Sequence, residues 1–532
     1  MKLPARSNLD HLKKQAKDLL RSYRAGDPAA ARLRTCTRSA TPALHDAQHC
    51  VAREYGFASW TDLKCYVEVQ NAASDDREAR VLRWLQHVYA GDVTGRPDRA
   101  RPLIAQRILA EHPDLAMDET WFACAIGDDT SLRRTISADP ASVHRVSGPL
   151  KLPPLVAVTH SGLMRLAEFR SSLHRCARVL LDAGADPNQR IANRWPPASL
   201  ESPDESEPLS SLYGAAGQNH DPELTGMLLA AGADPNDGES LYHSLESPEC
   251  TRLLLEAGAR IPGSNAMFRV FDLNQLRSLQ VLLAHGADPN EVPRNRPLTD
   301  FGSPLLWAIR RCSSRAHIEA LLAAGADPSA RTPEGISAHG LALRFGLIEI
   351  ADLLRDAAQE IPLEEQFLGA CARADEQEAR RIQSLRPDLP GSLAPRDLRM
   401  LPDLVSTGSD AAARIMVKLG WPIAARGGDI DGSALNLAVF RGEPGLTEFL
   451  LRHGASWQER HAYADNVIGS LSWASRNRPN EAGDWVGCAE ALLAHGMPAA
   501  TRDAQDPEWL IIDGGRKKFA DDVAALLTGE PL

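Results

Sequence analysis

The sequence predicts an all-α protein made of stacked helix pairs, and three observations lead to that prediction. A nine-residue phrase, Leu-Leu-x-x-Gly-Ala-Asp-Pro-Asn, returns several times along the chain, and such self-similarity is the signature of a repeat architecture. Ala and Leu dominate the apolar residues while aromatic residues make up only 5%, which favours helices over strands. Helix-start patterns precede the best copies of the phrase.

The repeated phrase has the composition of a helix end followed by a turn. Its leucines would cover the neighbouring unit, its Gly can adopt the left-handed backbone that ends a helix, and Asp-Pro-Asn would turn the chain. The clear copies are Leu180–Asn188, Leu228–Asn236, Leu282–Asn290 and Leu321–Ser329. The weaker copies are Leu254–Ala259, Leu450–Ala455 and Leu492–Gly496.

A further helix is expected before each phrase. In the best-formed unit this first helix opens at Ser433, Gly442 separates the two helices, and Gly454 ends the second. Another unit opens with Ser303 and Pro304. Ser at the N-cap followed by Pro at the first helical position is a favourable helix start.

A unit of helix, tight turn, helix and Gly-Ala-Asp loop resembles the ankyrin repeat. The family's opening motif, Thr-Pro-Leu-His-x-Ala, is altered here to Ser-Pro-Leu-Leu-Trp-Ala at residues 303–308 and to Ser-Ala-Leu-Asn-Leu-Ala at residues 433–438. The closing motif is better preserved, in four nearly identical copies. The resemblance covers most of the chain beyond residue 75. It implies an ankyrin-repeat solenoid whose first helices and loop tips form a concave binding face.

The repeats predict the domain organisation. Degenerate units around Trp121–Ala125 and Phe367–Cys371 extend the clear units of residues 150–358, so we expect one array over residues 80–360 and further ankyrin-type repeats over residues 361–500, with a joint near Pro362. The spacing of the terminal glycines is irregular, and the polar, Pro-rich stretch Gln189–Pro208 is expected to be an insertion. A capping helix is expected within residues 501–532.

Residues 1–75 are expected to form a small basic helical module. An apolar stripe at helical spacing begins at Leu9, a polar gap follows from Asp27 to Pro42, and two more helices are expected from Leu44 to Tyr55 and from Ser59 to Val69. Residues 1–40 carry ten Lys or Arg and three Asp or Glu, a net charge of +7. The segment resembles the leader of some bacterial ankyrin-repeat proteins, which implies a bacterial origin but no known activity.

Composition limits the possible classes of protein. The formal net charge of the 532 residues is −11, which argues against a chain that binds nucleic acid along its whole length. The nine cysteines are scattered and never spaced as Cys-x-x-Cys, which favours reduced, packed thiols over a disulfide framework. We see no signal peptide and no apolar run long enough to span a membrane, and a cytoplasmic protein is therefore expected.

Candidate chemical motifs are few, and each has a structural interpretation. His45 and His49 share a helix face at zinc-ligand spacing, but no third ligand is evident. Asp429 and Asp431 resemble part of a calcium loop that lacks the usual Glu. Three histidines stand just before a terminal Gly, where they would contact helix carbonyls; they are His285, His453 and His495. We expect no catalytic residue, no metal and no cofactor.

Register within the units gives the candidate binding residues. Counted from the opening Ser, the fifth, eighth and ninth positions of the first helix are expected to be free of core packing. These residues are Trp307, Arg310, Arg311, Arg344, Phe345, Phe440 and Arg441. Arg and aromatic residues are common hot spots of interfaces, although the phenylalanines could instead pack between units and the arginines could simply be solvated.

These positions predict a non-catalytic protein-interaction scaffold. Its partner is expected to be another protein, and an acidic surface would suit the arginines. Nucleic acid is disfavoured as a partner, and no membrane is expected to be involved. Two alternatives stay open: a nucleic-acid-associated protein that uses the basic N-terminal helices, and an effector delivered to a host cell.

Overall fold

The computed structural model is mostly helical and describes residues 3, 8–36, 42, 44–71, 77–97, 99–293, 298–355, 361–477 and 483–530. The chain divides into two compact units. The first contains Tyr55–Arg294 and Ala316–Asp327, and the second contains Asp10–Glu54, Asn295–Arg315 and Pro328–Leu532. Within the described ranges, no helix combines the length and the apolar character needed to cross a membrane.

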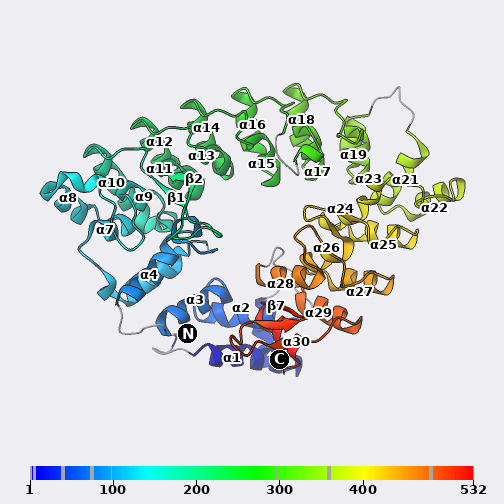
Figure 1. Ribbon diagram of the computed structural model, residues 1–532, viewed down its shortest axis with the longest axis horizontal. Helices are drawn as coiled ribbons and strands as arrows, with labels where there is room; N and C mark the ends of the chain where they lie inside the picture. Colours follow the sequence, from blue (N-terminus) through cyan, green and yellow to red (C-terminus); the bar gives the residue numbers. More distant parts are fainter. Residues whose placement is uncertain are drawn as a thin grey trace. The chain divides into compact units, whose positions relative to one another are not determined.

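The first unit contains helix pairs, and from α7 to α14 each helix contacts the helix two places further along the chain (Figure 1). The row α9, α11, α13 and α15 runs alongside the row α10, α12, α14 and α16. The helices of this unit are α3 (Trp60–Asn71), α4 (Arg77–Val88), α5 (Gly91–Thr94), α6 (Pro102–Glu111), α7 (Thr120–Ile126), α8 (Asp129–Ala138), α9 (Pro154–Thr159), α10 (Ala167–Asp182), α11 (Ser211–Tyr213), α12 (Pro222–Ala230), α13 (Ser240–His243), α14 (Pro248–Glu256), α15 (Ala266–Asp272), α16 (Leu276–Ala284) and α18 (Arg315–Ala323).

Where the repeated phrase occurs, it ends the second helix of a pair, as the sequence predicted. Its glycines have φ between 84° and 99° in all the clear and weak copies, the left-handed backbone that an L side chain adopts only with strain. In the first copy the Ala185 N–H donates to the Leu180 carbonyl (2.9 Å) and the Gly184 N–H to the Leu181 carbonyl (2.9 Å). This is the Schellman arrangement. The 6→1 bond recurs in the other copies, at residues 233, 259, 287, 326, 455 and 497.

The Asn of the phrase links one pair to the next. The Asn188 side chain donates to the carbonyl of Gly232 (3.2 Å) and accepts from the N–H of Asp234 (2.8 Å). Asn290 makes the same two bonds to the carbonyl of Gly325 (2.9 Å) and the N–H of Asp327 (2.9 Å). One amide side chain thus satisfies a helix-end carbonyl and a turn N–H of its neighbour.

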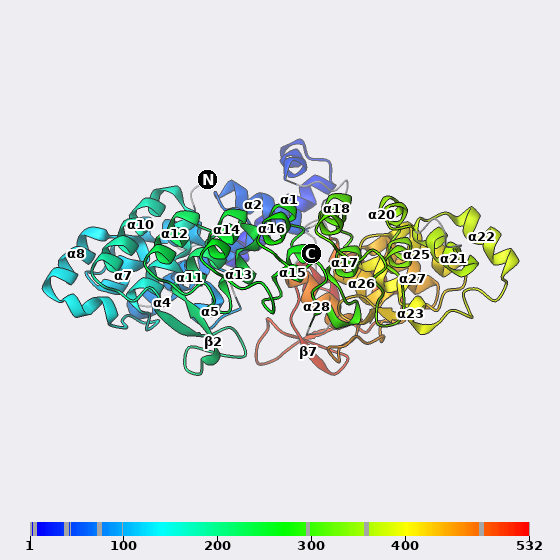
Figure 2. The same ribbon diagram turned by 90° about the horizontal axis from the view of Figure 1, so that it is seen from above.

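The expected insertion at Gln189–Pro208 is an antiparallel hairpin of β1 (Arg190–Asn193) and β2 (Asp204–Ser210). Arg194, which directly follows β1 on the loop side of the hairpin, is buried and donates to the carbonyls of Val93 (2.9 Å) and Leu150 (2.8 Å). In Figure 2 the hairpin extends beyond the neighbouring helices of its unit.

The second unit continues the arrangement of helix pairs, since α17 contacts α19, α24 contacts α26, and α26 contacts α28. Its helices are α1 (Leu9–Arg24), α2 (Leu44–Glu54), α17 (Pro304–Arg310), α19 (Ala338–Arg344), α20 (Ile348–Leu353), α21 (Leu363–Ala372), α22 (Glu376–Leu385), α23 (Pro395–Leu398), α24 (Met400–Ser406), α25 (Asp410–Lys418), α26 (Ala434–Arg441), α27 (Pro444–Arg452), α28 (Val467–Asn477), α29 (Trp485–Ala494) and α30 (Asp521–Thr528). Its strands are β3 (Arg426–Gly427), β4 (Gly432–Ser433), β5 (Thr501–Arg502), β6 (Leu510–Ile512) and β7 (Gly515–Lys517).

Three boundaries differ from the prediction. The expected polar gap contains a 3₁₀ helix, Pro28–Thr35, with Ala30 and Leu33 buried. The expected joint near Pro362 lies inside the second unit. Before α30, the C-terminal segment forms the three-stranded sheet β5-β6-β7 rather than a capping helix alone, because Leu510 and Ile512 alternate with the exposed Ile511 at strand period.

The N-terminal segment does not form one separate module. Residues 10–54 group with the second unit, whereas residues from Tyr55 onwards group with the first. Within the second unit, Lys13 pairs with Asp521 of α30 (3.5 Å) and the His45 ring lies 3.8 Å from Asp522. These two contacts join α1 and α2 to α30.

Candidate functional site

The seven register positions predicted as a binding face have different environments. Four of them are buried: Trp307, Arg310, Arg344 and Phe345. Arg310, at 2% exposure, is a core residue despite its charge. The prediction that these positions are free of core packing is therefore wrong for these four. Arg311, Phe440 and Arg441 are half-buried.

Arg310 and Arg311 share one carboxylate. Asp429 accepts from Nη2 of Arg310 (3.1 Å) and from Nη1 of Arg311 (2.7 Å). The Arg310 guanidinium also lies over the ring of Phe345, 5.3 Å from its centroid. Burial acts to raise the pKa of Asp429, but the positive charges of the two arginines lower it below its ordinary value. The oxygens that the sequence suggested for calcium are thus bound to arginine.

Arg344 is held by a second carboxylate group. Its Nη2 donates to Asp397 (2.9 Å), which is 0% exposed, and its Nη1 lies 3.5 Å from Glu365. Asp397 belongs to α23, and Asp403 of α24 lies 3.5 Å from Arg310. The register identified one face of α17 and α19, but it could not show that α23 and α24 cover that face with carboxylates. These arginines are therefore neutralised within the unit.

The two aromatic positions further along the unit are accessible. Phe440 of α26 stacks on Trp473 of α28, with ring centroids 5.0 Å apart and planes inclined by 10°. The Trp473 side chain is 52% exposed. Arg441 beside it pairs with Asp410 (2.7 Å) and Glu443 (3.0 Å). We call Phe440 and Trp473 the aromatic pair.

The sequence prediction missed Trp473, although a signal was present. Trp473 stands seven residues after Asn466, as Phe440 stands seven after Ser433. Asn466 accepts from the N–H of Ile468 (3.0 Å) at the start of α28. Because this helix lacks the Ser-Pro-Leu opening, its register could not be counted from the motif.

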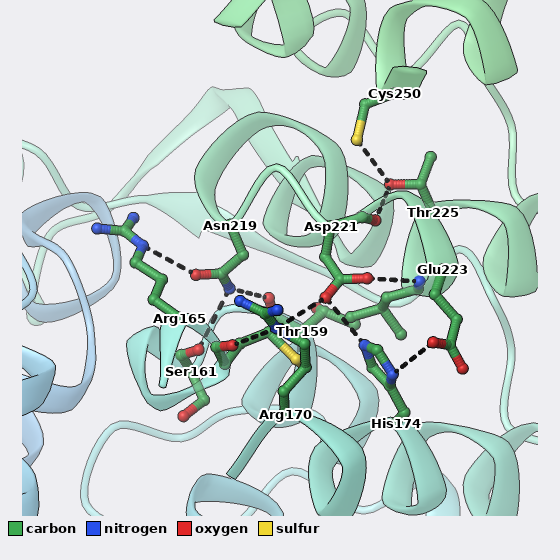
Figure 3. Close-up of polar contacts among 12 residues, drawn as sticks. Thr159, Ser161, Arg165, Arg170, His174, Asn219, Asp221, Glu223, Thr225 and Cys250 are labelled. Atoms are coloured by element: carbon green, nitrogen blue, oxygen red, sulfur yellow. Dashed lines mark hydrogen bonds and ion pairs between the residues drawn. The ribbon is translucent and has the colours of Figure 1, made fainter. Parts of the chain in front are cut away.

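The first unit contains a buried polar cluster that the sequence prediction also missed (Figure 3). His174 of α10 lies between two carboxylates: Nε2 is 2.9 Å from Asp221 and Nδ1 is 3.2 Å from Glu223. Both ring nitrogens therefore face carboxylate acceptors, which favours the doubly protonated ring. Burial alone would lower the pKa of His174, but the hydrogen bond and charge of Asp221 and the charge of Glu223 raise it.

Asp221 has a second role in this cluster, as the N-cap of α12. Its Oδ1 accepts from the N–H of Leu224 (2.9 Å), and its carbonyl accepts from the hydroxyl of Thr225 (2.7 Å). Burial acts to raise its pKa, but the bonds from His174 and Leu224 lower it below its ordinary value. The cluster therefore ties the start of α12 to α10 by charge as well as by packing.

Further along the same cluster, an amide closes a turn. Asn219 donates to the carbonyls of Thr159 (2.8 Å) and Ser161 (3.2 Å), and Arg165 donates to the Asn219 oxygen (3.2 Å) (Figure 3). These contacts join the end of α9 and the residues after it to residues that precede α12. The two bonds that Asn219 donates satisfy backbone carbonyls, which is a structural use of a polar side chain.

The histidine motifs have partners in the protein. His45 lies 3.5 Å from Asp46 as well as near Asp522, and the parts of the chain that the structure describes hold no group of three side chains able to bind a metal. Nδ1 of each helix-end histidine donates to the carbonyl four residues earlier, at 2.8 to 2.9 Å. These three residues are His285, His453 and His495, and the predicted contact with helix carbonyls is confirmed.

The cysteines and the basic N-terminal residues also have local explanations. All nine cysteines are free, and burial raises the pKa of Cys176 and Cys371 to about 12, so these thiols stay protonated at neutral pH. In the N-terminal segment, Arg32 pairs with Glu54 (2.6 Å) and Arg21 with Asp18 (3.0 Å). Part of the basic charge of this segment is therefore compensated.

No protein-family model matches the sequence, and no curated protein matches it. The function of the chain is therefore inferred from its own residues and contacts.

Proposed function

We propose that this chain is a non-catalytic scaffold of ankyrin-type repeats that binds another protein through the first helices of its units. The helix pairs, the Schellman ends after Leu180 and its equivalents, and the Asn bridges between neighbouring turns support the repeat assignment. A rigid array has already restricted much of its backbone, so binding a partner costs little further ordering.

The observation that carries the proposal is the aromatic pair, in which Trp473 is 52% exposed and Phe440 is half-buried. Large side chains that are partly exposed lose apolar contact with water when a partner covers them, and aromatic residues of this kind dominate interface energies. Phe440 and Trp473 come from adjacent first helices, and their stacking holds both rings in one orientation. The pair therefore offers a preorganised apolar contact.

The test measures partner binding by a variant that lacks both rings. A partner is first captured from native lysate with the full chain, identified and purified. Titration with Phe440→Ala/Trp473→Ala should then show binding weaker by about 2 kcal/mol, or roughly thirtyfold. The matched control is Trp195→Ala, because Trp195 is also a half-exposed tryptophan, at 47%, but lies in the other unit.

Circular dichroism separates loss of binding from loss of fold. Unchanged helicity with weakened binding in the double variant, and unchanged binding in Trp195→Ala, would support the proposal. Equal affinity of the folded double variant and the unsubstituted chain would remove the aromatic pair from the interface.

A further inference from the structure

The second unit contains two arginine pairs, of which one binds a carboxylate of the chain and the other lines a cavity. Arg310 and Arg311 hold Asp429 between them. Arg396 and Arg399 line a cavity of about 30 Å³ together with Phe301, Phe345, Arg344 and Asp403. Arg310 and Arg311 show how two neighbouring arginines of this unit bind a carboxylate. Arg396 and Arg399 present the same guanidinium groups at the cavity.

The donors of the second pair are only partly used. A guanidinium has five N–H donors. Among the described residues, Arg399 donates only from Nε, to Asp403 (3.3 Å). Arg396 donates from Nη1 to the Glu334 carbonyl, and its Nε lies 3.7 Å from Asp397. Within the same residues, both terminal nitrogens of Arg399 and Nη2 of Arg396 therefore have no protein acceptor.

Carboxylates of the chain also lie at the cavity: Asp403 and the exposed Glu334 line it, and Asp397 lies beside Arg396. Asp403 accepts from the N–H of Gly428 (2.7 Å) as well as from Arg399, and it lies 3.5 Å from Arg310. Asp397 accepts from Arg344. The Arg396 and Arg399 side chains remain 42% and 32% exposed, so an incoming group can reach them without removing these internal pairs.

We propose that this cavity binds a carboxylate from the partner protein, held by Arg396 and Arg399. Planar guanidinium groups match a carboxylate with paired hydrogen bonds. The proposal deepens the protein-binding function and rests on it for the source of the carboxylate.

The position of the cavity suits a partner that also covers the aromatic pair. Arg399 stands at the start of α24, whereas Phe440 lies near the end of α26. Helix α26 is the first helix of the next pair and contacts α24. At 1.5 Å per residue and about 10 Å between helices, such sites are separated by roughly 15 Å. This lies within the width of an ordinary protein interface.

The experiment titrates the full chain with N-acetylglutamic acid α-amide, whose single carboxylate is that of a Glu side chain, in a calorimeter at constant ionic strength. Arg399→Ala should weaken binding of the probe at least tenfold. Arg399→Lys keeps the positive charge but loses the planar guanidinium group, so its affinity for the probe should lie between those of Arg399→Ala and the unsubstituted chain. The control is Arg452→Ala, because Arg452 is an exposed arginine of the same unit that, among the residues the structure describes, pairs only with Glu448 of its own helix. The glutamine analogue of the probe should not bind.

Equal affinity of Arg396→Ala/Arg399→Ala and the unsubstituted chain for the probe would overturn the proposal. Inorganic phosphate that binds more tightly than the probe, and depends on both arginines, would also overturn it. The small probe needs no partner, so this result can be distinguished from failure of the aromatic pair to bind one. Arg399→Lys keeps the test decisive if an alanine variant does not fold.

Discussion

Helices α17 and α19 carry arginine at the position where α26 and α28 carry an aromatic ring. Arg310, Arg344, Phe440 and Trp473 each stand seven residues after the residue that precedes their helix. The two arginines are buried, and the two rings are partly or largely accessible. Hydrophobicity alone would predict the reverse.

The difference comes from what covers each stretch of first helices. Carboxylates of α23 and α24 reach Arg344 and Arg310, and a buried charge is stable only when such partners desolvate with it. Trp473 is covered on one face by Phe440 and remains 52% exposed. Register along a helix thus identifies a face, whereas burial depends on segments that lie far away in sequence.

The largest expected effect on stability is the loss of the buried arginine Arg344. Arg344→Ala should lower the free energy of unfolding by about 3 to 5 kcal/mol, because it leaves the buried carboxyl group of Asp397 without its main partner. Trp473→Ala should cost about 1 kcal/mol or less, because the side chain is half exposed. Urea unfolding followed by circular dichroism measures both values.

A double variant is the control for the arginine. Arg344→Leu/Asp397→Leu removes both charges, and we expect it to recover much of the lost stability, since two apolar groups need no mutual partner. If Arg344→Ala were no more destabilising than Trp473→Ala, the buried ion pair would not stabilise the second unit.

A smaller effect on stability is expected when the two neighbouring leucines Leu321 and Leu322 are compared. Leu321 is 0% exposed and Leu322 is half-buried, although both belong to the same leucine pair. From the repeat alone, Leu322→Asp is expected to cost about 3 kcal/mol or more. The burial seen in the structure instead predicts this loss of unfolding free energy for Leu321→Asp, and a loss of only about 1 kcal/mol for Leu322→Asp. Thermal unfolding of the two variants side by side decides between the two assignments, and equal melting temperatures would contradict the structural one.

The smallest expected effect concerns pH and the buried His174. A pKa raised by folding means that the His174 contribution is fully present below its ordinary pKa of 6.5 and is lost as the pH rises through the higher folded value. The pKa of Asp221 is lowered, so its contribution is lost only at acidic pH, below its ordinary value of 3.8. Raising the pH from 6 to 9 should therefore remove about 1 kcal/mol.

His174→Gln is the matched variant for this measurement, because it keeps a polar side chain but cannot be charged. Its stability should change less between pH 6 and pH 9 than that of the unsubstituted chain, in urea unfolding at constant ionic strength. The same pH dependence in both proteins would mean that other groups are responsible and that His174 is not charged in the folded chain.

Much of the local structure could be predicted because it depends on neighbouring residues. The phrase ending at Asn188 specifies a helix end, a left-handed Gly and a turn, and each is present. The helix starts at Ser433 and Ser59 were also predicted, and both side chains accept a cap hydrogen bond. The candidate site was predicted only in part, since Phe440 is accessible whereas Arg310 and Arg344 are not.

The sequence by itself determined where helices begin and end, because capping, left-handed Gly and leucine spacing act within a few residues. Only the tertiary structure decided which charges lie inside. Asp397 is 53 residues from Arg344, and Asp429 is 118 residues from Arg311, and no local pattern in the sequence marks these pairs. Burial and charge neutralisation depend on contacts between distant segments, and they therefore leave Phe440 and Trp473, rather than the buried arginines, accessible to a partner.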